Sequence, residues 1–355
     1  MTRALKTVGA VAIVLVLCIS FAVAQEKISP LSDYQYKRDY AQVEGIMKEA
    51  DPQKRADLLM AFQKEHPISR MVDYVALQYL ECAKPSIQKK DWAKAISMEE
   101  ALLALLPSEK TVQSAGIPVG VDDFLKKQLL PAQKSVYSAL MAAYYQSGNF
   151  AKAADMGEKV YAMGPDKAMA ATLAEIYLNM KNYDKYLAYG EKILAEFPID
   201  QSFGTALQMA SVYLQKQNAD KARDLYGKVV QAFGDKVPTG MQQPAWNGVR
   251  AAYEALTGAD AYAKKDYAKA LDAYTKVVQY APQSDEAYYY IGMCKWNNKD
   301  MDGAIEPFAK AAVLGKTFAK RAQDHLDELW KARHPDNPGG IEEVKTKAKA
   351  DLGIK

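Results

Sequence analysis

Apolar side chains recur three and four residues apart through most of the chain, and this spacing predicts amphipathic helices. The first helix of each predicted pair carries a large residue, usually a small one, and then Tyr, as in Leu173, Ala174 and Tyr177. After a short turn, the second helix begins with an aromatic residue and has a small one three positions on, as at Tyr267 and Ala270. Small residues at both places let two helices cross closely, so the pattern predicts packed helix pairs.

The pattern repeats with a period of about 34 residues. Gly258 and Gly292 are 34 positions apart, as are Ala270 and Ala304. Segments that carry the pattern well are 134–166, 167–200, 203–234, 251–284 and 285–316, and weaker copies occupy 36–69 and 70–107. We therefore expect an array of helix pairs in which each pair contacts its neighbours.

The succession of a large residue, Gly or Ala, and Tyr, followed by an aromatic residue, Ala and Pro, resembles the tetratricopeptide repeat. The resemblance covers roughly 36–316 and is specific in 134–316; Tyr186 departs from it in place of a small residue, and Ala261 and Lys295 in place of Tyr. It implies an all-α fold, a right-handed superhelical solenoid of helix-turn-helix repeats. About five repeats are clear and two are degenerate, with a C-terminal capping helix after them.

Changes in composition divide the array. We expect degenerate helical repeats in 25–107 and clear repeat blocks in 134–234 and 251–316. Gly and Pro in 108–133 and 235–250 mark these segments as insertions. Residues 317–355 are predicted to form the capping helix and then, after the sequence HPDNPGG, a charged helix.

The N-terminus has the pattern of a secretory signal. Arg3 and Lys6 precede an apolar run, and Ala22 and Ala24 mark a small-residue cleavage site before Gln25. Residues 1–24 are therefore predicted to direct export, to the bacterial periplasm. An uncleaved N-terminal anchor is the alternative.

The charge content bears on the class of partner, and the cysteine content bears on disulfide bonding. Without residues 1–24, 44 basic side chains stand against 43 acidic ones, which leaves no electrostatic footprint for nucleic acid. Cys82 and Cys294 then remain, in repeats several helix pairs apart. A disulfide needs Cα atoms within about 7 Å, so we expect two buried, unpaired thiols.

The chain shows no constellation of catalytic residues. His66 is predicted at a helix end, and no set of cysteines and carboxylates with metal-ligand spacing surrounds His325 and His334. Residues 115–120 lack the Lys of a phosphate-binding loop, and no Gly-x-Ser-x-Gly sequence occurs. We expect no enzymatic activity, no metal and no cofactor.

The family resemblance implies that the first helix of each repeat lines a concave groove. The inward positions so implied are Tyr145, Gln146, Glu175, Asn179, Leu214, Tyr262, Tyr289, Met293, Trp296 and Asn297. The matching positions in 134–316 supply no Lys or Arg, so a clamp for a C-terminal carboxylate is not expected. Aromatic and amide groups suit an extended or helical peptide. Alternatively, Tyr262, Tyr289 and Trp296 pack against the insertions or the C-terminal helix.

These observations favour an exported, non-catalytic scaffold that binds a protein or peptide partner in the groove. Residues 61–83 and 196–214 are loosely similar to repeats of periplasmic scaffolds in envelope assembly. One alternative is a structural component that self-associates or supports a membrane-associated complex through its C-terminal helix. Another is a binder of glycan or of a small ligand that uses the aromatic groove.

Overall fold

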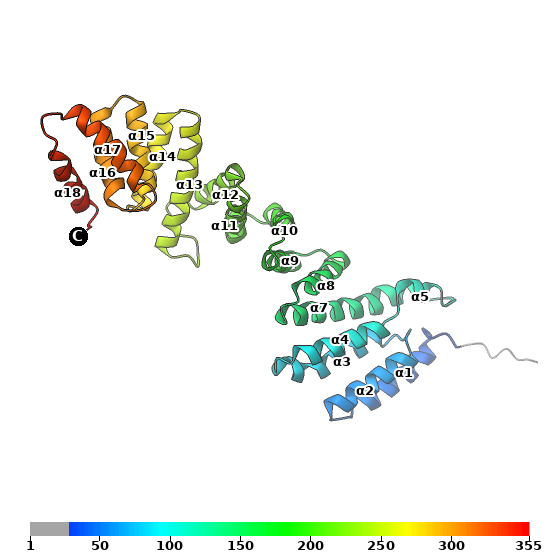
Figure 1. Cartoon of the computed structure of the whole chain (residues 1–355). Coiled ribbons are helices and arrows are strands. Elements are labelled where there is room, and N and C mark those ends of the chain that lie inside the picture. The colour runs from blue at the N-terminus through cyan, green and yellow to red at the C-terminus, as the bar shows by residue number, and fades with distance from the viewer. Residues whose placement is uncertain (1–27, 355) are drawn as a thin grey trace, which may run out of the picture. The chain divides into compact units, whose positions relative to one another are not determined.

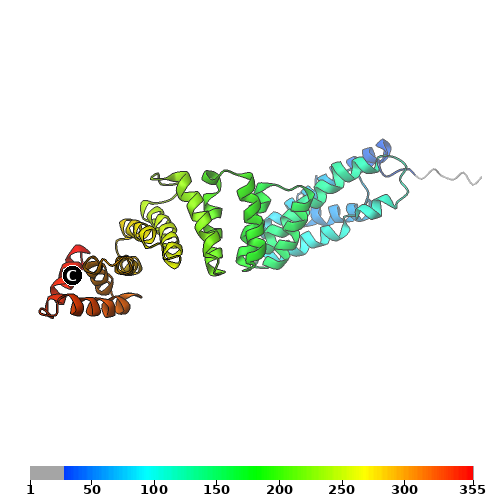
Figure 2. The same ribbon diagram turned by 90° about the horizontal axis from the view of Figure 1, so that it is seen from above.

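The computed structural model describes residues 28–354, and its elements are helical, with no strand in that range. The predicted all-α fold of packed helix pairs is confirmed. The predicted signal segment, 1–24, lies outside the described residues. The chain divides into two compact units, the first ending at Ser147 and the second beginning at Gly148 (Figures 1 and 2). Between residues 28 and 354, no helix is both long enough and apolar enough to cross a bilayer.

The first unit is built from helix pairs that pack side by side. The pairs α1–α2 and α3–α4 are followed by α7, which packs on both α3 and α4. The helices are α1 (Asp33–Ile46), α2 (Pro52–Glu65), α3 (Val72–Gln88), α4 (Trp92–Leu105), α5 (Glu109–Gln113), α6 (Val121–Phe124), the π-helical turn η1 (Leu125–Leu129) and α7 (Leu130–Gln146).

Much of the segment 108–133, predicted as an insertion, is helical. It contains α5, and α6 then continues through η1 into α7. Pro131 sits in the first turn of α7 and has no N–H to donate to the carbonyl of Lys127. A single π-helical turn can interrupt the regular hydrogen-bond pattern without ending a helix, and η1 lies directly before the turn that holds Pro131.

The second unit continues the succession of pairs. Its helices are α8 (Phe150–Met163), α9 (Lys167–Asn179), α10 (Tyr183–Glu196), α11 (Ile199–Gln215), α12 (Ala219–Phe233), α13 (Gln243–Ala263), α14 (Tyr267–Tyr280), α15 (Asp285–Asn297), α16 (Met301–Val313), α17 (Ala319–Arg333) and α18 (Gly340–Asp351). The boundary between the units falls inside the segment 134–166, so α7 and α8 belong to different units. Helix α13 begins within the segment 235–250.

Glycine sets the close crossing of the helix pairs in the second unit. A Cβ atom built on Gly258 of α13 would lie 2.8 Å from the ring of Tyr274 on α14. A Cβ on Gly292 of α15 would lie 2.7 Å from the ring of Phe308 on α16. Both rings are fully buried. The 34-residue spacing of these glycines therefore reflects one packing contact made twice.

One turn geometry joins the two helices of six successive pairs. A residue with positive φ ends the first helix, and the next residue caps the second helix through its side-chain oxygen. At Lys265 and Asp266, for example, φ is 62° and the cap accepts the backbone N–H of Lys269 at 3.1 Å. The six turns are Lys90–Asp91, Gly148–Asn149, Lys181–Asn182, Gln217–Asn218, Lys265–Asp266 and Lys299–Asp300.

The last two helices cover the end of the second unit. Both α17 and α18 pack on α16. Leu326 and Leu329 of α17 and Ala348 of α18 are buried in the same apolar cluster as Phe308. Lys310 of α16 also pairs with Asp351 at 3.3 Å.

Candidate functional site

Predicted groove residues on α13 and α15 come together in the second unit. The side-chain amide of Asn297 donates to the Tyr262 hydroxyl at 3.4 Å and to the Met293 carbonyl oxygen at 2.8 Å. The ring of Tyr262 packs edge-on against Tyr267 and Tyr290. Tyr262 and Met293 are half-buried, and Asn297 is exposed. The first helices of two consecutive pairs therefore share a surface, here called the first-helix patch (Tyr262, Met293 and Asn297).

Two other predicted groove residues, Tyr289 and Trp296, pack against α17. Tyr289 is 9% exposed, and its ring lies among Phe308, Phe318 and His325. Trp296 is half-buried and lies edge-on to His325, with ring centroids 5.0 Å apart. For these two residues, packing against the C-terminal helices is the arrangement in the structure. Tyr289 in particular has little surface left for a partner.

The remaining predicted groove residues lie on α7, α9 and α11. Glu175 and Asn179 are exposed on α9, where the Asn179 amide donates to the Glu175 carbonyl oxygen at 3.1 Å. Leu214 is 39% exposed on α11. Tyr145, half-buried, and Gln146, exposed, are on α7 and therefore in the first unit.

A hydrogen-bonded carboxylate links consecutive pairs at α8, α9 and α10. Glu158 accepts from the hydroxyls of Tyr177 and Tyr189, each at 2.6 Å, and from Lys185 at 3.2 Å. Burial opposes ionisation of Glu158, but these three hydrogen bonds together hold its pKa below the ordinary value. Burial and the carboxylate raise the pKa of Tyr189.

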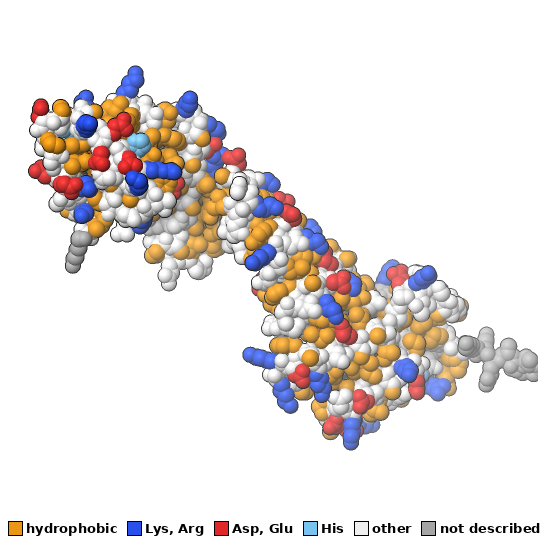
Figure 3. All heavy atoms as spheres, viewed as in Figure 1, with side chains coloured by type: hydrophobic (Ala, Val, Ile, Leu, Met, Phe, Trp, Pro, Cys, Tyr) orange, Lys and Arg blue, Asp and Glu red, His pale blue; other side chains and the backbone are white. Residues whose placement is uncertain are grey.

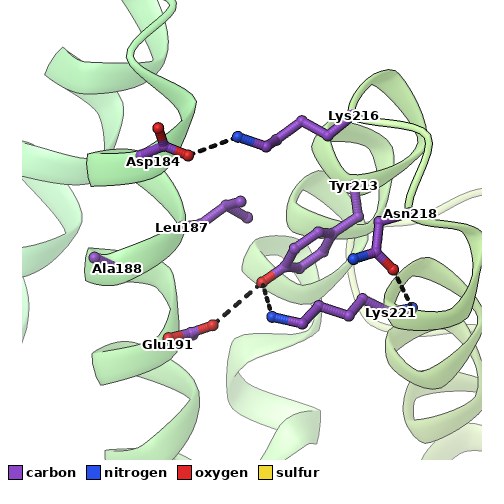
Figure 4. Close-up of a pocket in the computed structure, with 8 residues that line it drawn as sticks. All are labelled: Asp184, Leu187, Ala188, Glu191, Tyr213, Lys216, Asn218 and Lys221. Carbon is purple, nitrogen blue, oxygen red and sulfur yellow. Dashed lines mark hydrogen bonds and ion pairs between the residues drawn. The ribbon is translucent and has the colours of Figure 1, made fainter.

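The same arrangement recurs one pair later, in a pocket of about 330 Å³ between α10 and the α11–α12 turn (Figure 4). Tyr213 donates to Glu191 at 3.2 Å and accepts from Lys221 at 3.4 Å. Lys216 of the α11–α12 turn pairs with Asp184 of α10 at 2.6 Å (Figure 4). Asp184 and Lys216 form an ion pair, and Glu191 and Lys221 share the Tyr213 hydroxyl, so the pocket has two acidic and two basic groups. These contacts hold neighbouring pairs together.

Family models account for part of the chain. Two models of the tetratricopeptide repeat match, one at residues 205–235 and the other at 250–336. Both segments therefore consist of tetratricopeptide repeats. The longer match runs from α13 to the end of α17, so it includes the helix predicted as a cap. No curated protein matches the sequence.

Solved structures of the same class show low similarity. MamA of MSR-1 is 21% identical, with a TM-score of 0.36 over 52% of this chain and 97% of MamA. A tetratricopeptide repeat protein from Parabacteroides merdae is 13% identical, with a TM-score of 0.37 over 77% of this chain and 98% of that one. The TPR2AB domain of yeast Sti1, in complex with pHSP90, is 11% identical, with a TM-score of 0.34 over 89% and 99%. At such TM-scores, the family assignment rests on the repeat matches.

The carboxylate links between tetratricopeptide repeats were not predicted from the sequence, although a signal for them exists. Tyr and Lys occur eight residues apart at Tyr177 and Lys185, and again at Tyr213 and Lys221. In the first unit, Tyr144 of α7 similarly donates to Glu100 of α4. The acidic partner lies 19 to 44 residues upstream at no fixed spacing, so the sequence does not identify it.

Cys82 and Cys294, the two cysteines in the described part of the chain, lie in the protein interior. Cys82 and Cys294 are buried and unpaired, which confirms the prediction. Burial raises the pKa of the Cys294 thiol to about 12, so it stays protonated at neutral pH. Within residues 28–354, no group of three or more His, Cys, Asp or Glu side chains could hold a metal ion.

Proposed function

We propose that this chain is a non-catalytic, exported scaffold that binds a protein or peptide partner on the first helices of its tetratricopeptide repeats. The first-helix patch carries the proposal. It presents a phenol, an amide and a thioether from two consecutive repeats on one surface. Such groups bury apolar area and still offer hydrogen bonds, which suits a peptide backbone with mixed side chains.

The rest of the proposed surface follows the first helices of the earlier repeats. Glu175, Asn179 and Leu214 would extend it over α9 and α11, since all three are exposed. Tyr289 and Trp296 would act indirectly, by holding α15 against α17. On the face of the second unit seen in Figure 3, basic and acidic side chains are interspersed, which supports a partner without high net charge.

The test is capture of partners by the full chain with Tyr262→Ala and Asn297→Ala combined. Crosslinked pull-downs from the organism's own envelope fraction should recover a defined set of proteins with the parent chain. The double variant should lose most of that set, because it removes the shared hydrogen bond and the half-buried Tyr262 ring together.

The matched control is Tyr74→Ala, which removes an exposed tyrosine from the first unit. This variant should capture the same proteins as the parent. Circular dichroism should show equal helicity in all three chains. If the double variant captures the parental set at unchanged helicity, the groove proposal is wrong.

Export is part of the same proposal and rests on the sequence of residues 1–24. Cleavage after Ala24 would leave a chain that begins with Gln25. The intact mass of the protein from the envelope fraction distinguishes this outcome from a retained anchor, which would leave residues 1–24 in place.

A further inference from the structure

The first unit contains a pocket that none of the predicted groove residues lines. It has a volume of about 1010 Å³. Its walls come from the segment before α1, the first turns of α1, the α2–α3 turn and the loop between α5 and α6. The lining residues that carry the argument are Ile28, Tyr34, Asp39, Glu65, His66 and Ile117.

A buried acidic side chain lines this pocket. Asp39 of α1 is 1% exposed. Its carboxyl oxygens accept hydrogen bonds from the Ser69 hydroxyl at 2.5 Å and the Gln35 amide at 2.6 Å. The ring Nδ1 of His66 lies 3.6 Å from the oxygen that Gln35 contacts. These contacts fix the Asp39 carboxyl at the junction of α1 with the α2–α3 turn.

Part of the pocket lining is apolar and exposed to solvent. Ile28 is 53% exposed and Tyr34 is 58% exposed, and both line the pocket. Ile117 also lines it, from a stretch of chain outside any helix. Gly120, at φ 89°, places that loop near Leu31, because a Cβ there would lie 3.8 Å from the Leu31 side chain.

The pocket therefore combines exposed apolar walls with acidic groups. Asp39 and Glu65 line it, and His66 is the only basic side chain among its lining residues. An exposed apolar wall gains from covering by apolar side chains, and acidic groups favour a cation beside them.

We propose that this pocket binds a peptide segment in which Lys or Arg is flanked by apolar residues. The apolar side chains would lie against Ile28, Tyr34 and Ile117, and the cation would lie toward the exposed carboxylate of Glu65. The site goes beyond the first-helix groove, because it belongs to the other unit and has its own ligand chemistry. Its failure would leave the groove proposal unchanged.

The test uses three synthetic peptides, acetylated and amidated, with the sequences Ala-Leu-Lys-Leu-Ala, Ala-Leu-Gln-Leu-Ala and Ala-Leu-Glu-Leu-Ala. Each carries a fluorophore for anisotropy and, in a second preparation, a benzophenone for photocrosslinking to the full chain. The Lys peptide should bind at least tenfold more tightly than the Glu peptide. Its crosslinks should map to 28–39, 65–68 and 115–118.

Variants separate the pocket from other surfaces. Ile117→Asn should weaken binding of the Lys peptide about tenfold or more, and Glu65→Gln should reduce the Lys-over-Glu preference. Val119→Asn is the matched control, since Val119 is 78% exposed, lies two residues along the loop and does not line the pocket.

Three results would overturn the proposal. Equal binding of the Lys and Glu peptides would remove the role of the acidic groups. Crosslinks outside the three segments would place the peptide elsewhere. Displacement of the Lys peptide by an equal concentration of free spermidine would show that the site takes a small cation and not a peptide.

Discussion

Glu99 lies on the buried face of α4, where 1% of its surface reaches solvent. Its Oε2 atom has no hydrogen-bond partner. Burial raises the pKa of this carboxyl to about 7, from an ordinary value of 4.5. Tyr79 of α3 is also buried, and its pKa is raised to about 12, chiefly by burial and in part by Glu99. Burial therefore favours the protonated form of the Glu99 carboxyl in the folded first unit.

We predict that this acid makes the stability of the first unit depend on pH. Between pH 4.5 and pH 7, Glu99 keeps a proton in the folded chain that it has already lost in the unfolded chain. The contribution of protonated Glu99 to the free energy of unfolding is therefore complete below pH 4.5. This free energy falls as the pH rises through 7, by about 3 kcal/mol at most. Glu99→Gln, which has no proton to lose, should flatten the unfolding free energy over this range in urea titrations.

A matched variant tests whether Glu99 is the source. Glu81→Gln removes an exposed carboxylate from α3, where it pairs with Lys84. This variant should keep the pH dependence of the parent, because exposed pairs contribute little. The assignment fails if Glu99→Gln retains the parental slope.

At the scale of helical elements, the close crossing of α13 on α14 depends on Gly258, which has no side chain. Tyr274 lies over Gly258 and stacks on Tyr290 of the next repeat, with ring centroids 4.9 Å apart. Any group added at Gly258 must displace a ring that has no free space. The crossing and the contact between repeats are therefore coupled through Tyr274.

We predict that Gly258→Ala lowers the free energy of unfolding by about 1–3 kcal/mol, because the added methyl would overpack against Tyr274. Gly248→Ala provides the control on the same helix, since a Cβ there meets nothing within 4 Å. It should be neutral or should stabilise the chain by up to about 1 kcal/mol, because Ala favours helix. Urea titrations compare the two, and equal losses would contradict the role of the close crossing.

At the scale of the whole molecule, the two compact units each have their own buried core. In the second unit, α18 closes the end of the core by placing Ala348, 1% exposed, in the apolar cluster on α16. Units with separate cores commonly unfold in separate steps. We therefore expect two unfolding transitions for the full chain.

We predict that Ala348→Asp lowers only the transition of the second unit, by about 2 kcal/mol or more, because it buries an unpaired charge. Ala350→Asp makes the same substitution at an exposed position of α18 and should leave both transitions unchanged. Calorimetry of the full chain measures both transitions. A shift of the first unit's transition with Ala348→Asp would contradict independent unfolding.

The sequence alone determined the helix pairs and how their helices are joined. Small residues such as Gly258 and Ala270 predicted the close crossings, and the aromatic residue after each short turn predicted where the second helix begins. These features can be predicted because they are local: each depends on residues within one 34-residue repeat. For the same reason, the family resemblance suggested which helix faces could carry a partner.

Only the tertiary structure decided which of those faces remain exposed. His325 lies 36 residues from Tyr289, and its position against Tyr289 and Trp296 depends on how α17 packs on the preceding pair. The contact between Asp39 of α1 and Ser69 of the α2–α3 turn likewise joins residues 30 positions apart. Periodicity specifies the buried side of a helix, but the angle between elements distant in sequence determines which side chains they cover. The first-helix patch and the pocket around Asp39 are consequences of those angles.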